Sequence, residues 1–293
     1  MKKVIARIYK ALIRAHLAHP VVLVNMDGGI CSQMQQYLMG RLLQQRGCHV
    51  QFDLSFYAYG RDLDGRQVRN FDLLKIFPWL PFDAAPRWKR SLYRRCFRHN
   101  GHYPQTTSAD WLSRRAPVFL GGYYPDVREM YASYATLFHP VPDVLDEANR
   151  TLYDAIPDHS VAVHVRRGDL SAYNEAYGQP ASLDYFVEAV RLLRERLGRH
   201  TRFYLFSDDM DYVQTQLVPL LPRGLDLHLV DNDAAHGYFD LLLMSRCRHH
   251  ITSKGSLAKF AACMNMSQGI AIVVQDDRQL GPLAYSDKEI IRL

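Results

Sequence analysis

The C-terminal half of the chain alternates short apolar runs with longer amphipathic stretches, and this alternation restricts the fold more than any other feature of the sequence. Strands and helices that alternate at this spacing form a parallel sheet joined by right-handed crossovers. The sequence therefore predicts an α/β fold here. The predicted strands are residues 160–165, 201–206, 225–230, 250–253 and 270–274, and the predicted helices are residues 183–197, 210–217, 234–247 and 256–264.

The N-terminal half begins with a similar unit. An apolar run at 21–25 is followed by Asp27-Gly28-Gly29, by helical spacing at 33–45 and by a second apolar run at 50–57. This order is typical of a βαβ unit with a tight Gly loop. Prolines and aromatic residues interrupt the pattern from 60 to 140, where we expect loops and short helices that frame a cleft. The sequence thus predicts two Rossmann-like halves, 1–150 and 151–293, with a ligand cleft between them.

The composition is that of a soluble globular protein, with 48% hydrophobic and 23% charged residues among 293. The five cysteines include no CxxC pair, which argues against a disulfide framework and against a zinc ribbon. Arg7, Lys10 and Arg14 interrupt the N-terminal stretch where a signal peptide needs an apolar segment, and no window approaches about 18 uncharged apolar residues. We therefore expect a cytoplasmic protein that does not span a membrane.

Positive charge is concentrated in two segments. The formal net charge is +6; residues 1–20 carry five basic and no acidic residues, and residues 87–98 carry six basic residues. The first segment has the spacing of an amphipathic helix over 3–16. Two interpretations remain open: the helix contacts a membrane surface, or it packs on its own protein with solvated Lys and Arg side chains.

Ligands of open α/β sheets bind at the carboxyl ends of the strands, so the residues that follow each apolar run are candidate site residues. His164-Val165-Arg166-Arg167-Gly168-Asp169 ends the first strand of the C-terminal half. Two guanidinium groups at a strand end can hold a diphosphate through bidentate hydrogen bonds, and Gly168 allows the chain to turn. The alternative is an ordinary Arg–Asp surface pair at a turn.

Polar side chains also follow other strands. Asp208 and Asp209 can hold a divalent cation or cap the next helix, and Asp231-Asn232-Asp233 has the same ambiguity. Ser253-Lys254-Gly255-Ser256 precedes a helix, where it can receive a phosphate or form an N-cap. The loop at Asp27-Gly28-Gly29 lacks the spacing of a dinucleotide fingerprint and of a Walker A loop, which weakens NAD and ATP-kinase assignments.

These motifs, in this order, resemble those of the inverting bacterial α-1,2-fucosyltransferases, glycosyltransferase family 11. The most specific match is His-Val-Arg-Arg-Gly-Asp at 164–169, followed by Phe-Ser-Asp-Asp at 206–209. The segment at 240–247 resembles the family's Asp-x-x-x-Met-Ser-x-Cys. Gly28-Gly29 and the Gln-Met and Gln-Tyr pairs after it resemble the family's Gly-Gly-Leu-Gly-Asn-Gln-Met-Phe-Gln-Tyr. The resemblance covers residues 25–275 and is thinnest from 60 to 140.

The chain departs from the family in two loops. The family usually has Asn-Ser-Ser-Phe-Ser-Trp-Trp-Gly-Ala where this chain has Lys-Gly-Ser-Leu-Ala-Lys-Phe-Ala-Ala at 254–262. Ile30-Cys31 replaces Leu-Gly in the N-terminal loop. The chain therefore resembles a divergent branch, whose sugar is fucose or a relative such as colitose.

The resemblance implies a GT-B-type fold and inverting transfer of L-fucose from GDP-β-L-fucose to the 2-OH of a galactoside, in a glycan such as an O-antigen or an oligosaccharide. It implies no cofactor and no metal, because a guanidinium and helix-terminus amides stabilise the charge that grows on the diphosphate. By position, Arg166 contacts the β-phosphate, Arg167 supports its loop, and Asp27 is the candidate acceptor of the proton. The remaining donor-site residues implied are His164 and Asp240 at the guanine or ribose, Ser256 at a phosphate, and Asp169, Asp208, Gly28 and Gly29.

Other interpretations remain open. A metal-dependent glycosyltransferase would use Asp208 and Asp209, and a basic nucleic-acid-binding protein would use the aromatic and basic run at 88–95. A peripheral membrane protein without enzymatic activity is a third. Cys247-Arg248-His249-His250 has metal-ligand residue types, but no second cluster at zinc spacing supports a metal there. If the acceptor is lipid-linked, we expect the protein at the inner face of the membrane, held through residues 1–20 and 87–98.

Overall fold

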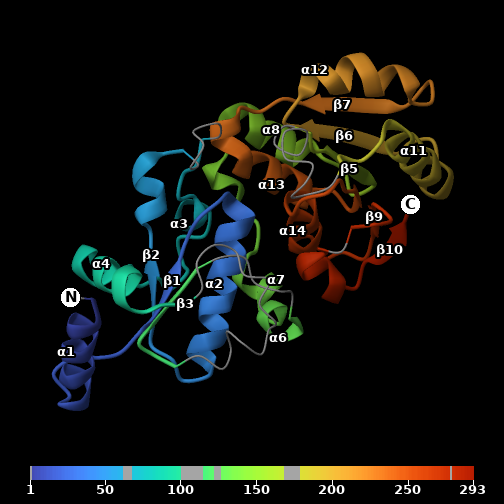
Figure 1. The fold of residues 1–293 in the computed structure, drawn as a ribbon. Coiled ribbons are helices and arrows are strands. Elements are labelled where there is room, and N and C mark those ends of the chain that lie inside the picture. The colour runs from blue at the N-terminus through green and yellow to red at the C-terminus, as the bar shows by residue number, and fades with distance from the viewer. Residues whose placement is uncertain (1, 62–67, 100–114, 122–126, 168–178, 278) are drawn as a thin grey trace. The chain divides into compact units, whose positions relative to one another are not determined.

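The computed structural model describes residues 2–61, 68–99, 115–121, 127–167, 179–277 and 279–293 (Figure 1). The chain divides into two compact units, Met1–Ser133 and Tyr134–Leu293. Each unit contains a sheet with parallel strand pairing, so the predicted α/β class with two Rossmann-like halves is confirmed. The units divide earlier in the chain than the predicted boundary after residue 150, because helices α7, Tyr134–Leu137, and α8, Glu147–Ala155, both pack against helices of the second unit.

The second unit is a doubly wound parallel sheet with strand order β10-β9-β8-β5-β6-β7. The chain runs outward from β5 to β7 and returns to β8 on the other side of β5, so the strand order reverses between β5 and β8. A reversal of this kind opens a crevice at the carboxyl ends of the two strands, where doubly wound proteins bind their ligands. The strands are β5 Ser160–Val165, β6 Arg202–Ser207, β7 Asp226–Val230, β8 His249–Ile251, β9 Ile270–Val273 and β10 Glu289–Arg292.

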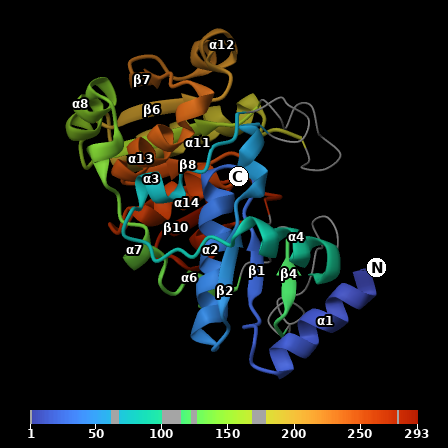
Figure 2. The ribbon, with the colours of Figure 1, turned by 90° about the vertical axis from the view of Figure 1, so that its left-hand side faces the viewer.

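Helices cover both faces of this sheet (Figure 2). Helix α11, Leu183–Leu197, begins where the Ser182 hydroxyl accepts a hydrogen bond from the Tyr185 amide, and its apolar face packs on the central strands. Helix α13, Gly237–Arg246, packs against both α8 and α14, Leu257–Met264. The other helices and short turns are α7 Tyr134–Leu137, η2 Pro142–Val144, α12 Met210–Tyr212, η3 Val213–Leu217, η4 Val218–Leu220, η5 Ala234–His236 and η6 Gly281–Tyr285.

The first unit has the strand order β2-β1-β4-β3, again with parallel pairing. Helix α2, Ile30–Gln45, follows β1 directly and is buried along most of its length. Gly40 permits this close packing, because a Cβ there would lie 2.7 Å from the Phe52 ring on β2. The other elements are β1 Val22–Asn25, β2 Val50–Asp53, β3 Arg98–His99, β4 Val118–Leu120, α1 Lys2–Arg14, η1 Ser55–Tyr59, α3 Leu73–Ile76, α4 Arg87–Cys96 and α6 Arg128–Tyr131.

Two predicted elements end early. The strand predicted over 50–57 stops at Asp53, because its carboxylate accepts hydrogen bonds from both the amide and the hydroxyl of Ser55 and turns the chain into η1. The helix predicted over 210–217 is α-helical only through Tyr212 and continues as a π-helical turn. In the part of the chain that is described, no helix is both long and apolar enough to cross a membrane.

Candidate functional site

The side chain of Arg166 lies immediately beyond β5, at the point where the strand order reverses. Its Nη1 lies 2.9 Å from Oδ2 of Asp208, which follows β6, and its backbone N–H donates to the Ser253 hydroxyl, 3.1 Å away beyond β8. Three neighbouring strands therefore fix this one residue. The Arg166 side chain is 26% exposed.

Asp208 holds both arginines of the pair. Its Oδ1 accepts the backbone N–H of Arg167 at 2.8 Å, while its Oδ2 faces Arg166. The Arg167 guanidinium lies over the Tyr212 ring, with its Cζ 3.6 Å from the ring centroid, and its Nε lies 3.9 Å from Oδ2 of Asp209. A cation over an aromatic ring is held in orientation. The two arginines are equally exposed, at 26% and 27%, but differ in their contacts, because Arg167 lies over the Tyr212 ring while Arg166 pairs closely with Asp208.

His164 occupies the inner side of the same strand end. It is buried, and its Nδ1 lies 3.1 Å from the Ser253 hydroxyl. Burial, together with the nearby positive charge of Arg166, lowers the pKa of His164 to about 4, so the ring is neutral at neutral pH. Ser253 joins His164 to the Arg166 backbone. Sequence reasoning placed Ser253 in a candidate phosphate loop but did not assign it this contact, which depends on the pairing of β5 with β8.

Ser256 immediately precedes α14. Its side chain is exposed and makes no capping hydrogen bond, and Gly255 before it has a positive φ of 112°. The N-cap alternative for the hydroxyl is therefore wrong in this conformation. Farther into the helix, Lys259 is fully buried, forms an ion pair with Asp277 and donates to the Gln279 carbonyl at 2.6 Å.

Asp240 lies in the first turn of α13, after β7. Its Oδ1 accepts a hydrogen bond from Asn232 at 2.8 Å, and Asn232 in turn accepts one from Asn149 of α8 at 3.0 Å. Burial raises the pKa of the Asp240 carboxyl to about 7, although the bond from Asn232 opposes the shift. Asp240 therefore changes its charge near neutral pH. Gly168 and Asp169, which complete the predicted motif after Arg167, lie outside the described residues.

The first unit contributes the loop Asp27-Gly28-Gly29, which lies between β1 and α2. Asp27 is buried; its two carboxylate oxygens accept hydrogen bonds from Gln36 and Asn25, each at 2.7 Å. Burial raises the pKa of Asp27, and these two hydrogen bonds oppose the rise. Gly28 has a φ of 73°, a left-handed conformation that favours glycine, and Gly29 precedes the first turn of α2.

A polar cluster beside this loop was not predicted. Asp53, at the end of β2, is fully buried and receives Arg94 Nε at 2.7 Å, with Arg90 Nη1 3.8 Å away. Arg94 also donates to Asn25 at 3.2 Å, so it connects Asp53 to the residue that binds Asp27. Sequence reasoning counted Asp53 as part of a strand and Arg94 as part of a basic run. Only the fold brings them together.

The remaining metal candidates do not form a cluster. Among the residues that the structure describes, no group of three or more His, Cys, Asp or Glu side chains could hold a metal ion. In the segment at 247–250, Cys247 and His250 are buried, and His250 Nε2 lies 3.0 Å from the Met244 carbonyl. Burial raises the pKa of the Cys247 thiol to about 12 and lowers that of His250 to about 3. Both pKa shifts are those expected of side chains buried in the core.

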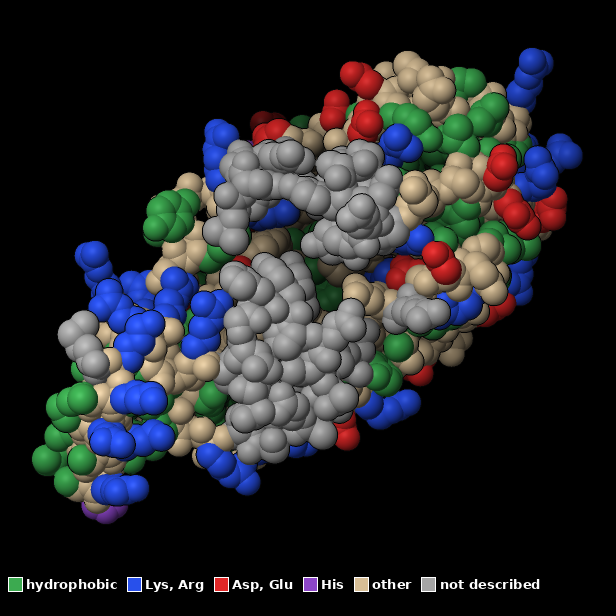
Figure 3. Space-filling model, viewed as in Figure 1, with side chains coloured by type: hydrophobic (Ala, Val, Ile, Leu, Met, Phe, Trp, Pro, Cys, Tyr) green, Lys and Arg blue, Asp and Glu red, His purple; other side chains and the backbone are tan. Residues whose placement is uncertain are grey.

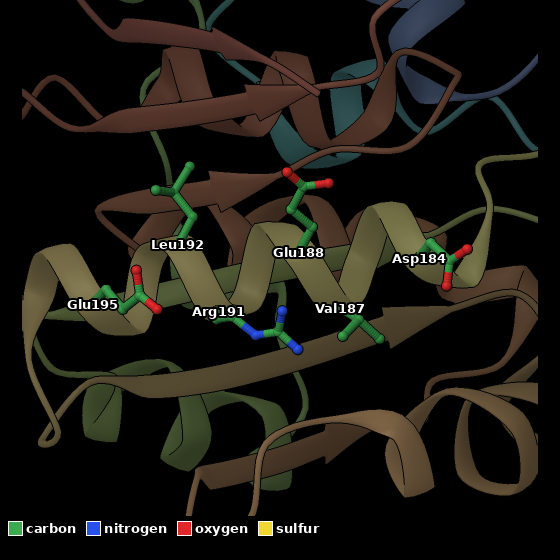
Figure 4. Close-up of a pocket in the computed structure, with 6 residues that line it drawn as sticks. All are labelled: Asp184, Val187, Glu188, Arg191, Leu192 and Glu195. Carbon is green, nitrogen blue, oxygen red and sulfur yellow. The ribbon is translucent and has the colours of Figure 1, made fainter.

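A depression of about 460 Å³ lies on the outside of α11 (Figure 4). Its lining comes from one helix and includes no predicted site residue, so we do not assign it a function. The lining side chains are Asp184, Val187, Glu188, Arg191, Leu192 and Glu195.

Several solved structures resemble this chain at low sequence identity. The chain is similar in fold to the ADP-heptose LPS heptosyltransferase II of E. coli, with 13% identity, 93% and 90% of the two chains covered and a TM-score of 0.47. It is also similar to a glycosyl transferase family 9 protein of Veillonella parvula, with 13% identity, 94% and 87% coverage and a TM-score of 0.48. A third structure, the NodZ α-1,6-fucosyltransferase soaked with GDP-fucose, has 14% identity, 83% and 93% coverage and a TM-score of 0.41. The sequences of curated proteins give no significant match.

The sequence also matches a family model. The match runs over residues 95–281, which is more than half of the chain and contains β5, the two arginines, Asp208, Asp240 and Ser256. The model carries the description glycosyl transferase family 11, the family that the motif order had indicated. This chain belongs to glycosyl transferase family 11 and is a glycosyltransferase.

Proposed function

We propose that the protein transfers L-fucose, with inversion, from GDP-β-L-fucose to the 2-OH of a galactoside in a glycan, forming an α-1,2 linkage. The observation that supports this proposal most is the place of Arg166, a partly exposed arginine at the strand-order reversal that Asp208 and Ser253 hold in position. A fixed cation at a strand end can stabilise a leaving diphosphate. A related GDP-sugar such as colitose is the alternative donor.

In the proposed reaction, the acceptor oxygen forms a bond to the anomeric carbon while the bond from that carbon to the β-phosphate oxygen breaks. The electron pair of the broken bond leaves with GDP, so negative charge grows on the diphosphate. Arg166 and the exposed Ser256 at the start of α14 bind this charge, while Arg167 keeps its loop in place. Interactions that strengthen as the charge develops lower the barrier.

The acceptor hydroxyl also loses a proton, and we propose Asp27 as its acceptor. The raised pKa of Asp27 favours this assignment, because a carboxylate with a raised pKa binds a proton more readily than an ordinary aspartate. Hydrogen bonds from Gln36 and Asn25 fix both of its oxygens in direction. Gly28 and Gly29 allow a substrate to approach the adjoining backbone closely.

GDP should be the nucleotide that stabilises the protein most in a thermal-shift screen against UDP, CMP and NAD. A ligand at about 100 times its dissociation constant adds about 2.7 kcal/mol to the free energy of unfolding. Incubation with GDP-fucose and a β-galactoside, followed by NMR of the product, then tests the linkage. Preferential stabilisation by UDP, or a product linked at another hydroxyl, would contradict the proposal.

The affinity for GDP should depend on pH through Asp240, if its carboxylate accepts hydrogen bonds from the guanine or ribose. The pKa of Asp240 is raised to about 7, so the accepting form predominates above that pH and is lost below it. If only that form binds, GDP binding should be about tenfold weaker at pH 6 than at pH 8. Calorimetric titration measures this change. An Asp240→Asn variant that keeps the same pH dependence would show that another group is responsible.

Chelation should leave turnover largely intact, because we propose that Arg166 and the amides at the start of α14 supply the positive charge at the diphosphate. Oδ2 of Asp208 faces the Arg166 guanidinium and Oδ1 accepts the Arg167 amide, so a metal ion would have to displace these contacts to bind this carboxylate. The measurement is the rate with EDTA and again with added Mn²⁺. Loss of activity with EDTA, and its return with metal, would favour a metal-dependent enzyme that uses Asp208 and Asp209.

We further propose that the acceptor is carried on a lipid, as an O-antigen precursor would be, and that the protein works at the inner face of a membrane. Residues 1–20 and 87–98 supply the positive charge for this contact. A nucleic-acid-binding protein would use the same positive charge, but it would not require the strand-end residues of the second unit.

A further inference from the structure

The two basic segments, which are far apart in the sequence, form neighbouring parts of one surface. Helix α1 packs on α4: the Tyr9 ring lies 5.9 Å from the Tyr93 ring and 5.6 Å from the Phe97 ring. The hydroxyls of Tyr9 and Tyr93 lie 3.3 Å apart, and Cys96 donates to the Lys2 carbonyl. This contact attaches α1 through one narrow side and fixes it to α4.

Only a small part of α1 is used in that attachment. Tyr9 is buried, and Ala6 and Ile13 pack beside it in the same cluster. At about 100° per residue, these three positions lie on one side of the helix. Four other apolar side chains of α1 lie outside this contact and face solvent. Val4, Ile5, Ile8 and Leu12 are 56%, 40%, 57% and 38% exposed. We call these four residues the apolar stripe.

Positive charge lies next to the apolar stripe. Lys3, Arg7, Lys10 and Arg14 recur at three- and four-residue spacing along another side of α1, and all four are exposed. Figure 3 shows hydrophobic side chains along one edge of α1 and Lys and Arg side chains along the adjacent edge, with more Lys and Arg over α4. Helix α1 has no acidic residue. Such a helix has the side-chain distribution of one that lies in the interface of an anionic bilayer.

Helix α4 extends this surface. Trp88 is 59% exposed, and Lys89 Nζ lies 5.5 Å from its ring centroid. Tryptophan beside a cation is typical of the membrane interface, where the ring sits among the lipid headgroups. The opposite side of α4 holds the polar cluster, since Arg90 and Arg94 face the buried Asp53. One helix therefore connects the surface to the loop that carries Asp27.

We propose that the apolar stripe of α1, its basic flank and Trp88 of α4 form a single docking face for an anionic lipid bilayer. The inference rests on the proposed lipid-linked acceptor and specifies how the first unit meets the membrane. The charges select this partner over a second copy of the chain, because two such faces in a symmetric pair would bring like charges together. The apolar stripe favours a bilayer over RNA, because exposed aliphatic side chains make no favourable contact with a phosphate backbone. Docking through α4 would bring a lipid-linked glycan to the side of the first unit that carries Asp27.

The test is co-sedimentation of the full chain with vesicles of phosphatidylcholine alone and with phosphatidylglycerol added. The parent should bind the anionic vesicles and bind the neutral ones weakly. A Lys3→Gln/Arg7→Gln/Lys10→Gln variant should partition on the order of 100-fold less, since each cation near an anionic surface contributes about fivefold. Ile5→Gln/Ile8→Gln/Leu12→Gln should also lose binding. On vesicles, the fluorescence of the parent should shift to shorter wavelength, and Trp88→Phe should lack that shift.

Matched controls lie outside the face. Leu220 and Met266 are exposed apolar residues of the second unit, and Leu220→Gln/Met266→Gln should sediment as the parent does. The charge control is Arg46→Gln/Arg191→Gln/Arg199→Gln, which removes three exposed cations elsewhere. Each variant is also assayed with a soluble acceptor. Normal transfer with lost vesicle binding supports the docking face, whereas vesicle binding by a chain that transfers no fucose overturns only the proposed reaction.

Three results would overturn the inference. The first is vesicle binding that neither α1 variant weakens. The second is a parent dimer that the Ile5/Ile8/Leu12 variant converts to a monomer without any change in vesicle binding, which would assign the stripe to a second copy. The third is tight, salt-sensitive binding of the parent to RNA with no binding to anionic vesicles.

Discussion

Arg166→Ala should reduce turnover with GDP-fucose by a factor on the order of 100 to 1,000. The estimate comes from the effect of removing one preorganised hydrogen-bond donor from a developing oxyanion. Asp208 and Ser253 hold Arg166 in place before any substrate arrives, so the guanidinium needs little rearrangement to bind the diphosphate. Steady-state kinetics measures the loss, and it should fall mainly on kcat if the contact strengthens in the transition state.

Arg166→Lys should restore little activity, because an ammonium group cannot make the bidentate contact of a guanidinium. Arg191→Ala is the matched control, since it removes an exposed arginine from α11 of the same unit. Unfolding of each variant by urea shows whether the second unit remains intact. Turnover within threefold of the parent, in a folded Arg166→Ala protein, would exclude Arg166 from the reaction.

Lys259→Ala should lower the free energy of unfolding of the second unit by about 3–5 kcal/mol, because breaking a buried ion pair leaves an uncompensated charge. Lys259 and Asp277 are both buried and form an ion pair, and the other Asp277 oxygen accepts the Gln279 amide. Removal of the ammonium leaves the Asp277 carboxylate without its counter-ion. Urea denaturation followed by circular dichroism measures the change.

A neighbouring pair supplies the control. Lys254 and Asp276 lie 2.9 Å apart, but Asp276 is 69% exposed, so Lys254→Ala should cost less than about 1 kcal/mol. Replacing both members of the buried pair, in Lys259→Met/Asp277→Leu, should restore most of the stability, since apolar side chains of similar volume leave no charge behind. A Lys259→Ala protein as stable as Lys254→Ala would show that water reaches Asp277.

Local patterns in the sequence predicted the elements whose signals are long or regular. Helix α11 has the predicted bounds, because Ser182 caps it, its apolar residues recur at helical spacing and Gly198 follows its last residue. Strand β4 was missed because it lies in the region from 60 to 140, where prolines and aromatic residues interrupt the pattern. Strand β10 was missed because its two apolar residues stand between charged ones and form no recognisable apolar run. Their pairing with distant strands defines them.

Some residues of the candidate site could be predicted from the sequence, and their contacts could not. The strand-end rule found Arg166 and Asp208 from sequence, because each follows an apolar run. Asp240 was indicated only by the resemblance of residues 240–247 to the family's segment. The rule could not pair Asp208 with Arg166, or join Ser253 to His164, since those contacts depend on which strands are neighbours. The cluster of Asp53 and Arg94 is the clearest omission, because a buried carboxylate inside an apolar run gives no sign of its partner.

The loop at 27–29 is already ordered by side chains from several directions. The Gln36 side chain bonds both to the Asp27 amide and to its carboxylate, and Tyr57 and Gln33 both donate to the Gly28 carbonyl. Immobilising a flexible loop subtracts from the affinity of any ligand that must order it. A glycan that reaches this loop therefore meets a rigid template, so the entropy lost on binding should come mainly from the flexible sugar chain and little from the protein.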